Sequence, residues 1–323
     1  MSNSKLIFGS ILVLFFLTFS SVMAAEKQKV ILDTDLGGDI DDAFALALVL
    51  ISPEFEVLGI TLDHGLTRKK AQIAARMLYE TGREDIPIAV GRQTPNVVGQ
   101  DTEPGNYESQ YRWAEGFEKI RPIEQSAPDF IIDQLKKYPG EVVLFTVGPV
   151  PNIGDIVRKD PEALKSAKHI YSMFGSFYMG YGRDPVPDAE WNVRADVESA
   201  KLLASAGAPI TYAGLDITTF VTLEEENRQK LPMRHSPLTD ALTGLYTLWG
   251  HQTPVLYDVV AVGMALWPEL YGTRPAHVEV IDGGYTVIDE SETPNAQVGM
   301  SINTNEFMRR IMTRYLEQNL SRE

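Results

Sequence analysis

The segment KVILDTDLGGDIDDAFALALVL, from Lys29 to Leu50, constrains this chain more than any other stretch. It begins with an apolar run at 30–32 that is short enough for a buried strand. The run AFALALVL that follows Asp42 has high helix propensity, and the two glycines in between permit a tight turn. The pattern therefore predicts a strand, an acidic turn and a helix.

The acidic turn carries more charge than a helix cap needs. Five aspartates fall within ten residues: Asp33, Asp35, Asp39, Asp41 and Asp42. A carboxylate in the first turn of a helix gains only about 0.3–1 kcal/mol from the helix dipole, whereas neighbouring anions repel one another at close range. A hard cation bound by oxygen atoms removes this repulsion, and calcium, which takes about 6–8 oxygen ligands, fits best. The spacing excludes an EF-hand, and the alternatives are a solvated turn with one capping aspartate and a DxD-type, magnesium-dependent phosphohydrolase loop with Asp33 as nucleophile.

The N-terminus has the pattern of a secretory signal peptide. A positive charge precedes a mostly apolar run at 6–19, and residues 22–24 resemble a cleavage site. We therefore expect residues 1–24 to be removed after Ala24, which would leave one secreted or periplasmic domain at 25–323 that does not enter the membrane. An uncleaved membrane anchor is the alternative, because the apolar run approaches the length of a membrane span.

Composition narrows the range of partners and of chemistry. The formal net charge of −15 argues against nucleic acid or an anionic membrane surface as a partner. The chain contains no cysteine, which excludes disulfides, a thiolate nucleophile and thiolate metal ligands. About 300 residues remain after cleavage, which suffices for one large α/β domain.

Strand and helix patterns alternate through most of the chain. We expect strands at 56–63, 85–90, 141–147, 169–173 and 209–213, and helices at 67–81, 128–138, 195–206, 223–230, 236–250 and 303–319. This alternation predicts an α/β fold with a mostly parallel open sheet flanked by helices. Ligands of such sheets bind beyond the carboxyl ends of the strands, where the first aspartates lie. The polar segment 91–125 is expected to be a loop near the site, either a lid or a structural excursion, and 277–300 to form edge strands or a hairpin.

Four motifs resemble those of the nucleoside hydrolase family. DTDLGGDIDDAFAL resembles the signature DxDPGxDDAxAL, with Leu36 in place of proline and a turn about two residues longer. GPVPNI at 148–153 resembles the GPLTN turn, and PDAEWNVRADVESA at 187–200 resembles PxAEFNxxxDPEAA. The segment that begins at Pro254 resembles HDPxAV. The resemblance covers most of the mature chain and implies a single nucleoside hydrolase-like domain.

The resemblance also implies an activity and a site. The activity is calcium-dependent hydrolysis of the N-glycosidic bond of ribonucleosides of the inosine or uridine type, by an enzyme that could be a homodimer or homotetramer. The implied calcium ligands are Asp35, Asp42, the backbone carbonyl of Val147, and Asp258. Asp35 is in addition the implied proton acceptor, and Asp41, Glu190 and Asn192 are implied to contact the sugar. Asp184 stands where the family usually has asparagine, and His64 follows the second strand, so both are further candidates for sugar contacts.

Two positions depart from the family pattern. Tyr257 replaces the histidine often assigned to protonation of the leaving base, and a tyrosine is a candidate for the same role; His251 or aromatic residues of the long polar loop are alternatives. Leu66 replaces an asparagine that touches ribose, which predicts weak binding of simple ribonucleosides unless His64 or Asp63 takes over the contact. These departures leave open a secreted nucleoside- or sugar-binding protein that has lost turnover.

Overall fold

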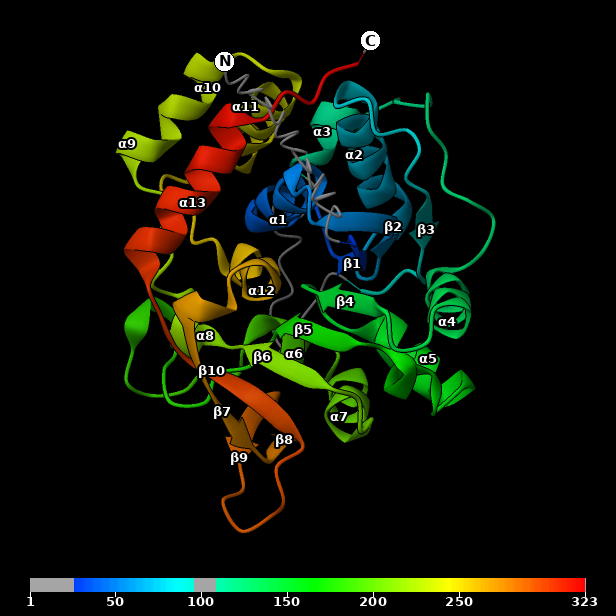
Figure 1. Ribbon diagram of the computed structural model, residues 1–323, viewed down its shortest axis with the longest axis vertical. Coiled ribbons are helices and arrows are strands. Elements are labelled where there is room, and N and C mark those ends of the chain that lie inside the picture. Colours follow the sequence, from blue (N-terminus) through cyan, green and yellow to red (C-terminus); the bar gives the residue numbers. More distant parts are fainter. Residues whose placement is uncertain (1–25, 96–108, 323) are drawn as a thin grey trace, which may run out of the picture.

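The computed structural model describes residues 26–95 and 109–322, so the predicted signal peptide and part of the predicted lid lie outside the described residues. A central sheet has the strand order β3-β2-β1-β4-β5-β6-β10-β7, and all neighbouring pairs are parallel except β10 and β7 (Figure 1). Its strands are β1 (Gln28–Thr34), β2 (Phe55–Leu62), β3 (Ile88–Val90), β4 (Val142–Thr146), β5 (His169–Met173), β6 (Ile210–Ala213), β7 (Tyr271–Ala276) and β10 (Ala296–Ile302). The predicted α/β fold with a mostly parallel open sheet is confirmed.

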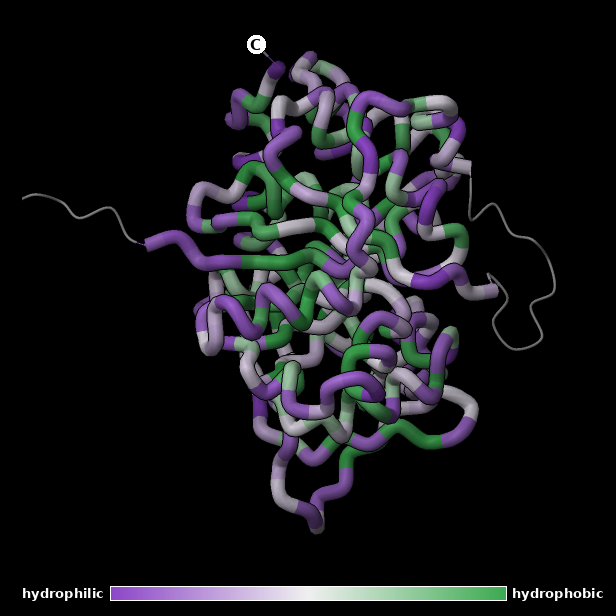
Figure 2. The backbone as a smooth tube through the Cα atoms, turned by 90° about the vertical axis from the view of Figure 1, so that its right-hand side faces the viewer, coloured by the Kyte–Doolittle hydropathy of each residue, from purple (hydrophilic) through white to green (hydrophobic). Residues whose placement is uncertain are grey.

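Helices cover both faces of this sheet. The helices are α1 (Asp41–Ile51), α2 (Thr67–Glu80), α3 (Tyr111–Ala114), α4 (Ala127–Lys137), α5 (Pro151–Lys159), α6 (Trp191–Ala195), α7 (Val197–Ser205), α8 (Leu215–Thr218), α9 (Glu225–Arg228), α10 (Lys230–Arg234), α11 (Pro237–Trp249), α12 (Tyr257–Leu266) and α13 (Thr304–Glu317), with short 3-10 turns η1 (Ala163–Ser166), η2 (Tyr181–Arg183) and η3 (Pro268–Leu270). One core lies under α1, α2, α11, α12 and α13, and a second lies under α4, α5 and α7 (Figure 1). The hydropathy colouring agrees, since apolar backbone segments run through the middle of the molecule (Figure 2).

The sheet register brings the carboxyl ends of its central strands to one edge. Asp33 in β1 pairs with Thr61 in β2 and with Thr146 in β4. Thr146 in turn pairs with Ser172 in β5. The residues that follow β1, β2, β4 and β5 therefore meet at the same edge, as the ligand-binding rule for parallel sheets requires.

Helix α1 is buried along almost its whole length, from Asp41 to Leu50. Its sequence is apolar on every side after the two aspartates, which is typical of a helix enclosed by other elements. It packs against α12 and α13, and the Tyr315 hydroxyl of α13 donates a 2.8 Å hydrogen bond to the carbonyl of Phe44. The aspartates at its N-terminus are consequently held inside the protein.

Several elements differ in detail from the expected ranges. The strand expected at 85–90 covers only Ile88–Val90, and the helix expected at 223–230 divides into the short helices α9 and α10. The expected hairpin is formed by β8 (Val278–Ile281) and β9 (Tyr285–Ile288), whereas β10 joins the central sheet beside β6. No helix among the described residues is long and apolar enough to cross a membrane.

Candidate active site

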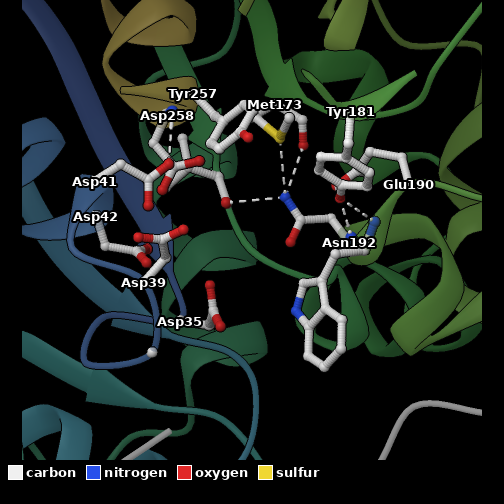
Figure 3. Close-up of a pocket in the computed structure, with 13 residues that line it drawn as sticks. Asp35, Asp39, Asp41, Asp42, Met173, Tyr181, Glu190, Asn192, Tyr257 and Asp258 are labelled. Atoms are coloured by element: carbon white, nitrogen blue, oxygen red, sulfur yellow. Dashed lines mark hydrogen bonds between the residues drawn. The ribbon is translucent and has the colours of Figure 1, made fainter. Parts of the chain in front are cut away.

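A pocket of about 200 Å³ opens at the carboxyl edge of the sheet (Figure 3). One wall is acidic and consists of Asp35, Asp39, Asp41, Asp42 and Asp258. The other side is formed by Val147, Met173, Tyr181, Glu190, Trp191, Asn192 and Tyr257. The pocket therefore places a strongly anionic surface opposite aromatic and amide side chains.

Three buried carboxylates form a compact group that we call the cation group: Asp41, Asp42 and Asp258. One oxygen of each lies within 4.8 Å of the others. They converge because α1 and α12 pack together with both N-termini at this edge, and the backbone N–H of Asp258 donates a 3.2 Å hydrogen bond to Asp41. Burial, reinforced by the neighbouring carboxylates, raises the pKa of all three well above the usual range. A hard divalent cation bound by oxygens fits this group, because it would relieve the repulsion.

The other predicted ligands flank the cation group in different ways. The carbonyl of Val147 lies at the pocket and accepts a 3.1 Å hydrogen bond from the Asn192 amide. Asp35 lines the pocket but is not part of the cation group, and Figure 3 shows its carboxylate apart from those of Asp42 and Asp258. Asp41, predicted to contact the sugar, is instead a member of the group.

Raised carboxyl pKa values have a consequence for stability that we predict for the metal-free protein. Burial raises the pKa of Asp33 and of Glu190 to about 7, so the folded protein binds more protons than the unfolded chain above about pH 4. The stability that these protons contribute is complete below the unfolded pKa and is lost as pH rises through the folded pKa. We expect the Tm in EDTA to fall by at least ~5 °C between pH 5 and pH 8, and calcium to restore most of it at pH 8. A Tm in EDTA that rises with pH over this range would contradict the prediction.

Glu190 and Asn192 are both buried and line the pocket, as the motif in which they stand predicts. The Glu190 carboxylate caps α6 by accepting hydrogen bonds from the backbone N–H groups of Asn192 (2.9 Å) and of Gly175 (3.1 Å). The Asn192 amide donates to the carbonyls of Val147 and Met173, both at 3.1 Å. These bonds fix both side chains before any substrate binds.

Two tyrosines stand side by side at the pocket. Tyr257 is the first residue of α12, and its ring meets that of Tyr181 edge-to-face at 6.1 Å. Burial raises the pKa of Tyr257, so its phenol is protonated at neutral pH and can donate a hydrogen bond. The Tyr181 hydroxyl accepts a 2.8 Å hydrogen bond from the backbone N–H of Trp191. The sequence prediction missed Tyr181, whose only signal was an aromatic residue between two glycines shortly before a recognised motif.

The lengthened turn places Asp39 on the acidic wall, another residue to which the sequence prediction gave no separate role. The Gln110 side chain supports this turn by donating to the carbonyls of Gly38 (2.9 Å) and Asp39 (2.8 Å). The two extra residues of the turn thus bring one more carboxylate to the pocket.

Two predicted sugar contacts do not line the pocket. His64 is buried, its Nδ1 lies 2.7 Å from the Thr94 hydroxyl, and burial lowers its pKa to about 4. Asp184 is exposed and accepts a 2.9 Å hydrogen bond from the backbone N–H of Val186, which is a local turn contact. Both side chains have local partners that turn them from the pocket.

Four more residues near the motifs also lie outside the pocket. Neither Leu66 nor Asp63 is a lining residue, and His251 is an exposed side chain away from it. Asp33 is fully buried and accepts a 2.8 Å hydrogen bond from the Asn152 amide. A nucleophilic Asp33, as a phosphohydrolase would need, has no access to substrate there.

A parallel α/β fold with buried oxygen ligands at its carboxyl edge, beside a pocket for a small molecule, defines the class of metal-dependent α/β enzymes. Residues 30–309 match the family described as inosine-uridine preferring nucleoside hydrolase. The chain belongs to this family, and it is an N-glycosyl hydrolase.

Named relatives match nearly the whole chain. A probable uridine nucleosidase 2 of Arabidopsis thaliana is 28% identical, and the match covers 90% of this chain and 98% of the relative. The pyrimidine-specific ribonucleoside hydrolase RihA of Citrobacter koseri is 29% identical, with 86% and 95% covered. A purine-preferring ribonucleoside hydrolase from Gardnerella vaginalis has a similar structure, with a TM-score of 0.77, 26% identity, and 89% and 98% covered. A plant nucleoside hydrolase shares the fold with a TM-score of 0.78 at 24% identity, with 90% and 99% covered.

Proposed function

We propose that this protein hydrolyses the N-glycosidic bond of ribonucleosides of the inosine and uridine type, with calcium as its cation. The observation that carries the proposal is the assembly of the cation group, Glu190, Asn192 and Tyr257 around one small pocket. Relatives named for uridine, for pyrimidine and for purine ribonucleosides support a pocket that accepts both classes of base.

The cation site would use Asp42, Asp258, the carbonyl of Val147 and, by its position in the cation group, Asp41. These are all hard oxygen donors, which favours calcium over softer metals. A bound calcium ion would hold a water molecule and lower the pKa of that water. We assign proton acceptance to Asp35, because its carboxylate lines the pocket beside the cation group.

The remaining residues divide between the sugar and the leaving base. Cleavage of a glycosidic bond passes through an oxocarbenium-like transition state, and the acidic wall is suited to stabilise its positive charge. Glu190 and Asn192 would bind sugar hydroxyls in the orientation that their own hydrogen bonds fix. Tyr257 would donate its phenolic proton to the departing base, while the exposed ring of Tyr181 offers a surface on which a base can stack.

We also propose that residues 1–24 are a signal peptide, that the mature domain is secreted or periplasmic, and that it forms a homodimer or homotetramer. The apolar run at 6–19 supports the first two statements. The intact mass of the exported protein and its mass in solution would test them.

Cleavage of inosine and uridine, compared with their 2′- and 3′-deoxy forms, tests the proposed substrate. Calcium-dependent release of ribose from the parent nucleosides is expected, whereas binding without release would favour the alternative of a binding protein. Because neither Leu66 nor the polar side chains of Asp63 and His64 line the pocket, we expect one hydroxyl to lack its contact. A missing contact to a buried hydroxyl costs about 1–3 kcal/mol, or roughly one to two decades of affinity.

We therefore expect one deoxy form to be cleaved within about tenfold of its parent, and the other to lose several decades. A loss of several decades for both deoxy forms would show that both hydroxyls are bound, and it would contradict this prediction.

A further inference from the structure

Lys70 is the only lysine or arginine that is buried among the residues described in the structure. It lies in the first half of α2, four residues after Leu66, so both side chains project from the same face of the helix toward the acidic turn. Three aspartates act on its charge: Asp35, Asp42 and Asp63. A buried ammonium group is costly unless it is paired, so its partners identify its role.

The partner of Lys70 is Asp35, through two contacts. The ammonium group donates a hydrogen bond to the backbone carbonyl of Asp35 and lies 3.3 Å from Oδ2 of the same residue. The side chains of Lys70 and Asp35 are 6% and 14% exposed, so water screens the pair little. One cation therefore fixes the carboxylate relative to its own backbone.

The acidic turn is shaped to lie directly on α2. Gly37 has φ of 107°, a conformation that strongly favours glycine. A Cβ atom at Gly37 would lie 2.7 Å from Cδ1 of Ile73 and 3.9 Å from Cγ of Lys70. The turn thus approaches the helix too closely for any side chain, and this close approach brings Asp35 within reach of Lys70.

The pairing accounts for the position of Asp35 in the pocket. Asp41, Asp42 and Asp258 converge, whereas Asp35, which the sequence resemblance implies to be both a cation ligand and the base, stays apart from them. We propose that Lys70 is a positioning residue that holds Asp35 away from the cation group, so that Asp35 serves as the proton acceptor and not as a ligand. The catalytic half of this inference rests on the proposed function; the structural half does not.

Lys70→Met, Lys70→Arg and the control Arg68→Met test the inference, since Arg68 is exposed on the same helix. In Lys70→Met, we expect kcat for inosine to fall about 100-fold with KM within about threefold, because a displaced base costs rate and not binding. We expect calcium to bind about tenfold more tightly, since a positive charge is removed and Asp35 is free to become a ligand. Lys70→Arg keeps the charge and should retain calcium affinity near that of the wild type, and Arg68→Met should change neither quantity.

Opposite changes in rate and calcium affinity are what a merely structural lysine would not produce. Loss of activity and calcium together in Lys70→Met, or no change in either, would overturn the inference. A crystal structure of calcium-loaded Lys70→Met adds a readout that is independent of turnover: Asp35 should move toward the cation group, and an unmoved Asp35 overturns the inference. If the wild-type protein released no ribose from any nucleoside, the proposed function would fail, while calcium titration and the crystal structure would still decide the role of Lys70.

Discussion

Replacing Asp42 with alanine abolishes stoichiometric calcium binding and lowers nucleoside hydrolysis by at least about three decades, because the cation supplies several kcal/mol of transition-state stabilisation. Asp42 is expected to have this effect because it is buried, belongs to the cation group and accepts a hydrogen bond from the Thr34 hydroxyl, which fixes its orientation. Elemental analysis of the purified variant gives the calcium content, and ribose release gives the rate.

Two further variants make this result specific. Asp240→Ala removes an exposed aspartate from the first turn of α11 and should keep both calcium and activity. Asp42→Asn preserves the size of the side chain while it removes one of the repelling charges. In calcium its Tm should fall below that of the wild type, whereas in EDTA it should be equal or higher. Full calcium occupancy in Asp42→Ala would refute the assignment.

Replacing Tyr257 with phenylalanine lowers kcat for inosine by about 100-fold or more, since general acid catalysis typically contributes about 10²–10⁴-fold. The phenol lies in the pocket, and burial keeps it protonated by raising its pKa, so it is available as a donor. A ribosyl substrate with nitrophenol as its leaving group needs no proton on departure and should be cleaved at nearly the wild-type rate.

The comparison of the two substrates separates an acid from a structural residue. Tyr246→Phe is the matched control, because the Tyr246 hydroxyl donates to the carbonyl of Gln252 outside the pocket. Equal losses for inosine and the nitrophenyl substrate, or no loss for either, would exclude Tyr257 as the acid.

The sequence was sufficient to predict the elements of the site that depend on local pattern. Apolar runs, glycines and clustered aspartates define the unit of β1, turn and α1 within a single segment, and the structure contains this unit. Asp258 is 217 residues from Asp41, and only the resemblance to a known motif connected the two. Alternation of strands and helices was enough to predict which edge of the sheet would hold the site.

Side-chain direction was beyond the reach of the pattern. His64 and Asp184 stand close to the motifs, but a neighbouring hydroxyl and a local turn, respectively, take up their polar atoms. Tyr181 reaches the pocket only because the loop after β5 folds back, and Lys70 reaches Asp35 only because Gly37 lets the turn settle on α2. Such contacts depend on the path of loops in three dimensions, which hydrophobic periodicity does not encode.

The burial of α1 has a consequence for the exchange of the cation. The helix that carries Asp41 and Asp42 is also packed into the larger hydrophobic core, where it contacts α12 and α13. These ligands therefore belong to a segment whose opening would break apolar contacts across the core, unlike the ligands of a surface loop. Release of the cation by movement of this helix is tied to disruption of the interior, so the ion behaves as a long-lived structural constituent of the fold and exchanges slowly with solvent.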